Sequence, residues 1–140
     1  MKYGIQETTV VCGLIVPEAM QHWNAGIALF NAGRYFEAHE ALEDAWREAP
    51  IHGARRRHLQ GLVQLAVAFH HQSTGNWQGA GSVLERALRN LSGAEESFPE
   101  LNLDALRTSL APWREHLASA RSGMQRPTPD LPQLRVRLQM

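Results

Sequence analysis

An internal repeat constrains the fold of this chain more than any other feature. Residues 33–46 and 75–88 carry one pattern, 42 positions apart, in which glycine, aromatic, alanine, leucine, glutamate and alanine recur in register. The apolar members follow the spacing of one face of an α-helix, and a helical hairpin of this kind cannot bury that face alone. The repeat therefore predicts stacked helical hairpins.

Local signals predict five helices. The first runs from about residue 17 to Gly33, the next three cover about 35–49, 54–72 and 77–91, and a fifth begins after Asn102. Gly33 and Gly75 each end a helix in a left-handed conformation that glycine adopts at little cost. Pro112 should kink or split the fifth helix, because proline lacks the N–H donor of a helical turn.

The third predicted helix has the most apolar sequence of the five. No Asp, Glu, Lys or Arg occurs between Arg57 and Glu85, and apolar residues cover most of the helix circumference. Such a helix is typically buried. One narrow polar sector remains, and it contains Arg57, Gln60, Gln64 and His71. The predicted fold is all-α: a compact bundle of about five helices, made of two pseudo-repeated, tetratricopeptide-like hairpins around a central apolar helix.

The chain divides into three predicted segments. Residues 1–16 show no helical period and should form an extended N-terminal arm or a short strand. Residues 17–122 form the helical bundle domain. Residues 123–140 contain three prolines and then alternate apolar and basic residues, which predicts an extended tail, either docked or mobile.

Composition excludes several classes of function. Basic and acidic residues balance at 14 each, so no nucleic-acid partner and no anionic membrane surface is expected. Cys12 is the only cysteine, which excludes an intramolecular disulfide. The apolar run 10–16 is too short to span a bilayer and lacks the basic start of a signal peptide, so a cytoplasmic protein is expected. The run Arg55–Arg57 is expected to be solvated or ion-paired.

A candidate site lies on the second predicted helix. His39 and Glu43 are one turn apart at the rim of the apolar face, beside Trp46. The second copy of the repeat has Gly81 at the position of His39, so the packing unit does not require a histidine there. Gly81 is equally consistent with a close approach between helices.

Three interpretations of the His39–Glu43 pair stay open. The pair can be structural, with Arg57 or Gln60 completing its hydrogen bonds. It can line a small-molecule or peptide pocket with Trp46 and the amides of the third helix. It can also contribute to a metal site, which would need His70 or His71 as a further ligand.

No catalytic constellation is present in the sequence. The HExxH pattern of zinc peptidases fails, because Glu43 stands where the second histidine belongs. No serine sits in a strand–turn–helix elbow, and no glycine-rich loop follows a strand. We therefore predict no cofactor and no metal, and the sequence leaves open whether the chain is an enzyme.

Three ordered motifs resemble a known family. They are FNAGRYFEAHEALEDAW (residues 30–46), LQGLVQLA (59–66) and GNWQGA (75–80). Together they resemble the family called domain of unknown function 309, over roughly residues 24–92. The resemblance implies a small all-α protein, mostly bacterial, with no established activity. By motif position it draws attention to six residues: His39, Glu40, Glu43, Trp46, Gln60 and Gln64.

Two functional hypotheses follow. The first is a protein-interaction or scaffold module that binds a protein segment or a second copy of itself. The second is a small-ligand-binding protein or an enzyme, metal-assisted or not. Its candidate site residues are His39, Glu43, Trp46, Arg57, Gln60 and Gln64. A scaffold predicts an apolar surface away from His39, whereas a ligand site predicts a concave pocket at His39.

Overall fold

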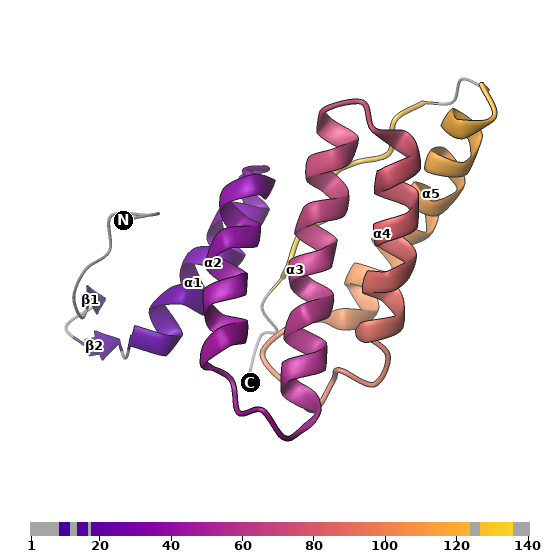
Figure 1. Cartoon of the computed structure of the whole chain (residues 1–140). Coiled ribbons are helices and arrows are strands. Elements are labelled where there is room, and N and C mark those ends of the chain that lie inside the picture. Colours follow the sequence, from indigo (N-terminus) through magenta and orange to yellow (C-terminus); the bar gives the residue numbers. More distant parts are fainter. Residues whose placement is uncertain (1–8, 12–13, 17, 124–126, 136–140) are drawn as a thin grey trace.

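The computed structural model describes residues 9–11, 14–16, 18–123 and 127–135, most of which lie in five helices (Figure 1). The helices are α1 (Glu18–Asn31), α2 (Tyr35–Glu48), α3 (Ala54–Ser73), α4 (Trp77–Asn90) and α5 (Leu103–Arg121). This confirms the predicted all-α bundle. No helix among the described residues is long and apolar enough to cross a membrane.

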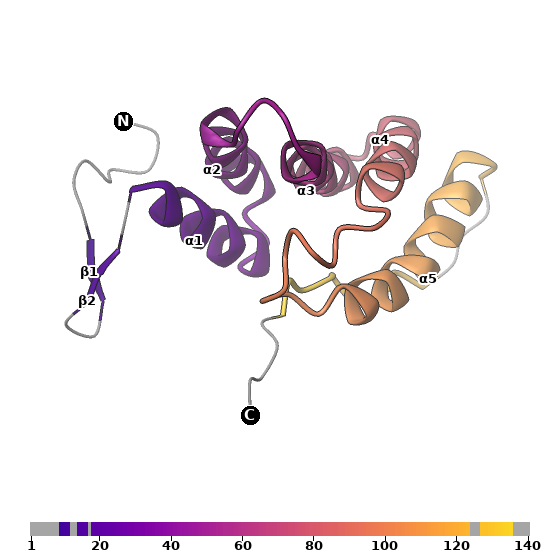
Figure 2. The ribbon, with the colours of Figure 1, turned by 90° about the horizontal axis from the view of Figure 1, so that it is seen from below.

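Two short strands precede the helices. β1 (Thr9–Val11) pairs antiparallel with β2 (Leu14–Val16), so that Thr9 lies opposite Val16 and Val11 opposite Leu14. The hairpin lies beyond the start of α1, apart from α2 to α5 (Figures 1 and 2). The other residues of the predicted arm, and Pro17, lie outside the described ranges.

The helices form an arc, which Figure 2 shows end-on. α2, α3 and α4 lie side by side, with α1 and α5 at the two ends of the arc. The segment 91–102 and the C-terminal tail occupy the concave side between α1 and α5. The core lies there and between the helices. Its largest fully buried side chains include Trp113, Phe30, Phe69 and Phe98.

α3 holds the central place in the arc, packed against α2 on one side and α4 on the other. Leu91 lies close to Gly61. A Cβ added to Gly61 would come within 2.9 Å of the Cγ of Leu91, which is why position 61 suits glycine. Burial of α3 is less complete than predicted. Val63 and Val67 are only half-buried and Gln60 is exposed, because the outer face of a helix in an arc has no neighbour.

The predicted helix signals act as expected. Gly33 and Gly75 have φ values of 78° and 84°, in the left-handed region. Asn102 begins α5, and its side-chain oxygen accepts a hydrogen bond from the backbone N–H of Ala105 at 3.0 Å. α5 continues through Pro112 as a single helix, and its axis bends along its course (Figure 2). Pro112 therefore does not split the helix.

The described part of the tail, residues 127–135, is extended and docked. The carboxamide of Asn31 donates to the carbonyl of Leu134 at 3.0 Å and accepts from its N–H at 2.6 Å. The indole Nε1 of Trp113 donates to the carbonyl of Asp130 at 2.8 Å. Leu134 is 2% exposed and belongs to the core. Residues 136–140 of the predicted tail lie outside the described ranges.

We expect Asn31→Ala to lower the free energy of unfolding by about 1–3 kcal/mol, because it leaves two buried backbone groups of Leu134 without partners. Urea denaturation followed by circular dichroism would measure the change. Asn24→Ala, at an exposed position of the same helix, is the matched control. Equal destabilisation by the two substitutions would contradict the role given to Asn31.

Candidate functional site

His39 and Glu43 lie close together, as predicted. The ring Nδ1 of His39 donates to the carbonyl of Phe36 at 2.7 Å, and its Nε2 lies 3.5 Å from a carboxylate oxygen of Glu43. Arg47 also pairs with Glu43. The carbonyl of Phe36 thus binds His39, and the guanidinium of Arg47 binds Glu43. The expectation that Arg57 or Gln60 would complete the hydrogen bonds of the pair was wrong.

The exposed ring of Phe36 joins two histidines on the surface. The rings of His39 and His70 both lie next to the ring of Phe36, at centroid distances of 5.2 Å and 5.3 Å. Among the described residues no group of three or more His, Cys, Asp or Glu side chains could hold a metal ion. Among these residues, the His39–Glu43 pair therefore has no third side chain beside it that could complete a metal site.

Trp46 belongs to a separate contact. The guanidinium of Arg56 stacks over its indole ring, 4.1 Å from the ring centroid. The same guanidinium donates to the carbonyls of Trp46 and Ala49, at 3.3 Å and 3.2 Å. Arg56 thus binds two carbonyls at the end of α2, and the carbonyl of Trp46 also accepts the backbone N–H of Ala49 at 3.2 Å.

The polar sector of α3 faces away from α2. Arg57 donates to the carbonyl of Ser92 at 3.2 Å, and Gln64 accepts from Asn90 at 2.7 Å, so both residues bind α4 or the segment after it. Gln60 is exposed. The structure therefore separates the six predicted site residues into several contacts and brings only His39 and Glu43 together. The ligand pocket predicted from them stays a prediction.

Arg55 and Arg57 are exposed, which is consistent with the expected solvation, and the run also binds carbonyls and aromatic rings. Arg55 lies 5.4 Å from the ring centroid of Trp23 and 5.3 Å from that of Phe98, and it donates to the carbonyl of Ser97. Cations at a helix N-terminus oppose the helix dipole. These contacts with neighbouring segments offset that cost and attach the segment after α4 to the start of α3.

Sequence reasoning missed His58, which is 2% exposed. Its Nδ1 lies 2.6 Å from the hydroxyl oxygen of Ser97, a spacing found in nucleophile–base pairs. The guanidinium of Arg57 lies 3.1 Å from Nε2, so both ring nitrogens of His58 have a polar neighbour. The apolar spacing of His58, Leu62 and Leu65 was the sequence signal for its burial.

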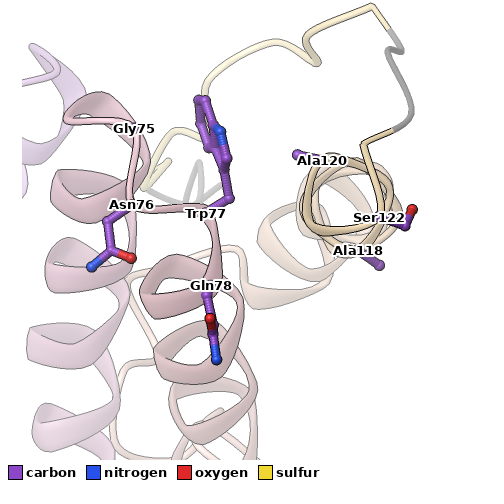
Figure 3. Close-up of a pocket in the computed structure, with 7 residues that line it drawn as sticks. All are labelled: Gly75, Asn76, Trp77, Gln78, Ala118, Ala120 and Ser122. Carbon is purple, nitrogen blue, oxygen red and sulfur yellow. The ribbon is translucent and has the colours of Figure 1, made fainter.

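Three cavities lie along α4 and α5. One of them, of about 700 Å³, lies between the start of α4 and the end of α5 (Figure 3). Trp77 stands on the α4 side of its opening, and Ala120 points toward it from α5. Two further cavities of about 510 and 440 Å³ follow along the same two helices.

These three cavities form one groove, which we call the α4–α5 groove. The first two share Ala118 in their walls, and the second and third share Ala111 and Arg114. Arg114 crosses the groove to Glu85, with two hydrogen bonds of 2.8 Å and 2.7 Å. None of the six predicted site residues lines it.

One sequence signal points to the α4 wall of the groove. The second copy of the repeat has Gly79 and Gly81 where the first has Glu37 and His39, and Gly81 lines the groove. The sequence held no such signal for the α5 wall, because the position of that wall depends on how α5 packs against α4.

The fold and the groove define a small helical-bundle domain that is open between its last two helices. Residues 23–83 match the family model described as "Domain of unknown function (DUF309)". The resemblance drawn from the sequence motifs is confirmed over these residues. α5 and the tail lie beyond the matched region.

Two relatives extend the comparison. The chain is 40% identical over 76 residues to "Uncharacterized protein YpuF" of Bacillus subtilis (strain 168), covering 54% of this chain and 43% of that protein. It is 28% identical over 96 residues to an "Uncharacterized protein" of Aquifex aeolicus (strain VF5), covering 69% of this chain and 26% of that protein. The chain thus spans less than half the length of either relative, and both organisms are bacteria.

We expect His39→Ala to lower the free energy of unfolding by less than about 1 kcal/mol, because the pair is partly exposed and Glu43 keeps Arg47 as its partner. Thermal unfolding would measure this, with His52→Ala in the exposed loop before α3 as the control. A loss of several kcal/mol would show that the pair is a buried structural contact.

We expect stability to fall as the pH falls below about 6.5, the ordinary pKa of histidine. Burial, and then the charge of Arg57, lower the pKa of His58 in the folded protein. The unfolded chain then binds more protons than the native one, so acid favours unfolding. Urea unfolding at pH 7.5 and 5.5 would measure this change. Between these two pH values, the free energy of unfolding should fall less for His58→Gln than for wild type. An equal fall in the two proteins would show that His58 is not the source of the pH dependence.

Proposed function

We propose that the chain is a protein-interaction module and that the α4–α5 groove binds a helical segment of a partner protein. The observation that carries this proposal is the continuity of three cavities along α4 and α5 through shared lining residues. Small-molecule sites are usually one enclosed pocket, whereas a long open groove between two helices suits a peptide.

The side chains of the groove favour a helix as its occupant. Ala111 and Ala118 lie seven residues apart, two turns along one face of α5, and Gly81 lies on the α4 wall. Small side chains at these positions let the backbone of a third helix approach closely. A helix also fits the furrow between two other helices, because its ridges pack into their grooves.

Apolar and charged groups in the groove are arranged as in a protein interface. Leu84, Leu88 and Leu117 contribute to its apolar lining. The ion pair of Arg114 with Glu85 and that of Arg107 with Glu95 provide charges of both signs. Protein–protein contacts typically combine apolar and charged groups. Charges of both signs in the groove favour a partner helix that also carries both signs.

The proposal places the interaction in the cytoplasm, where the single cysteine would stay reduced. It concerns the domain that this chain contains. Activities and partners of the longer relatives are a separate question, since each of them has further sequence beside the matched part.

A displayed library of helical peptides, selected against the intact chain, tests the proposal. Selected peptides should bind Ala118→Arg at least tenfold more weakly than wild type, because the arginine side chain fills the groove. Ala118 is exposed, so the substitution leaves the core intact.

Ala28→Arg is the matched control, since Ala28 is an exposed alanine of α1 outside the groove. Selected peptides should bind this variant as tightly as wild type. The proposal fails if no helical peptide is enriched, or if the enriched peptides bind Ala118→Arg as well as the control.

A further inference from the structure

We propose that the surface holding the C-terminal tail also accepts the tail of a second copy, so that two chains form a dimer by exchanging tails. We call this surface the tail seat. Its polar contacts come from three residues, Asn31, Asn102 and Trp113, and it holds residues 127–135. The inference is independent of the groove, which uses a different face of α5.

The tail seat recognises mainly the backbone of the tail. Asn31 binds both the carbonyl and the N–H of Leu134, and Trp113 binds the carbonyl of Asp130. The N–H of Asn102 donates to the carbonyl of Arg135 at 2.9 Å. The side chains that the seat buries are those of Pro132 and Leu134. The tail of a second copy offers all of these groups.

A second copy satisfies the seat better than a foreign peptide can. A foreign peptide must first displace the tail, which exposes Leu134 and leaves the backbone polar groups of the tail to water. Like the tail of a second copy, it must also compete with a tail that is attached to its own seat and therefore present at high effective concentration. A reciprocal exchange refills both seats with the same contacts, so its main cost is the entropy of association.

The path of the tail makes exchange geometrically simple. α5 ends at Arg121, and the tail then runs back along α5, binding Trp113 in its middle and Asn102 at its start. Gly123, with φ of 81°, lies at this reversal of the chain. A different backbone conformation at Gly123 would direct the tail away from its own seat.

The prolines of the tail support the same inference. Pro127, Pro129 and Pro132 favour an extended backbone even when the segment is free. The tail therefore loses less conformational entropy when it binds a new seat. A cavity of about 350 Å³ between the tail and α5, lined in part by Ser109, Pro129 and Leu131, would then have walls from both copies.

Refolding of the full chain tests the inference. Denatured wild type is refolded at low micromolar and at several hundred micromolar concentration, and the products are sized by analytical ultracentrifugation. We expect a dimer fraction that increases with the refolding concentration. Leu131→Asp, at an exposed position of the tail, should keep this dimer, and Leu134→Asp should abolish it. A monomer at every concentration, or a dimer that persists in Leu134→Asp, would overturn the inference.

A second variant covers the case in which Leu134→Asp fails to fold. Deleting residues 124–126 shortens the connection between Gly123 and the described part of the tail, and short hinge connections favour exchange between copies. We expect this chain to be dimeric even at low concentration, with the helical content of wild type by circular dichroism. A monomer from the shortened chain would overturn the inference. Ala118→Arg in the groove should leave exchange unchanged, so that failure of one proposal can be distinguished from failure of the other.

Discussion

The structure depends on a chain of aromatic contacts that crosses the concave side of the arc. Phe30 of α1 packs against Phe69 of α3, and Phe69 packs edge-on against Trp113 of α5 at a centroid distance of 5.1 Å. Tyr35 of α2 also contacts Phe69. An open row of helices buries each helix only against its neighbours. These rings connect the two ends of the arc through its middle, and aromatic pairs stabilise beyond the area that they bury.

The segment between α4 and α5 is attached to the same core by a different kind of contact. Phe98 lies 5.1 Å from Trp23 of α1 in a stacked arrangement, and Arg55 covers both rings. Arg57 and His58 bind Ser92 and Ser97 of this segment. The first turn of α3 thus connects α1 to the segment that leads into α5. Arg55 and Arg57 are exposed, but together with Arg56 they also bind neighbouring segments of the chain.

The fold was predictable from the sequence because its main signals are local. The glycines at 33 and 75 and the cap at Asn102 determine where helices end and begin, whatever surrounds them. The site was not predictable in the same way. Trp46 and Arg57 carry the right residue types for a site, but each finds its partner from an element that sequence periodicity cannot place. The α4–α5 groove likewise depends on the orientation of α5 relative to α4. The pairing of His58 with Ser97 depends on the path of the segment 91–102.

The docking of Leu134 beside Asn31 has a consequence for how the chain folds during synthesis. These residues are 103 positions apart, so the first helix meets its last packing partner only when the tail has left the ribosome. Contacts between such distant residues form late, because closing a long loop costs entropy before any contact repays it. Until then the end of α1 presents apolar surface to solvent. Residues 127–135 therefore determine when the domain completes its core, although they belong to no helix or strand.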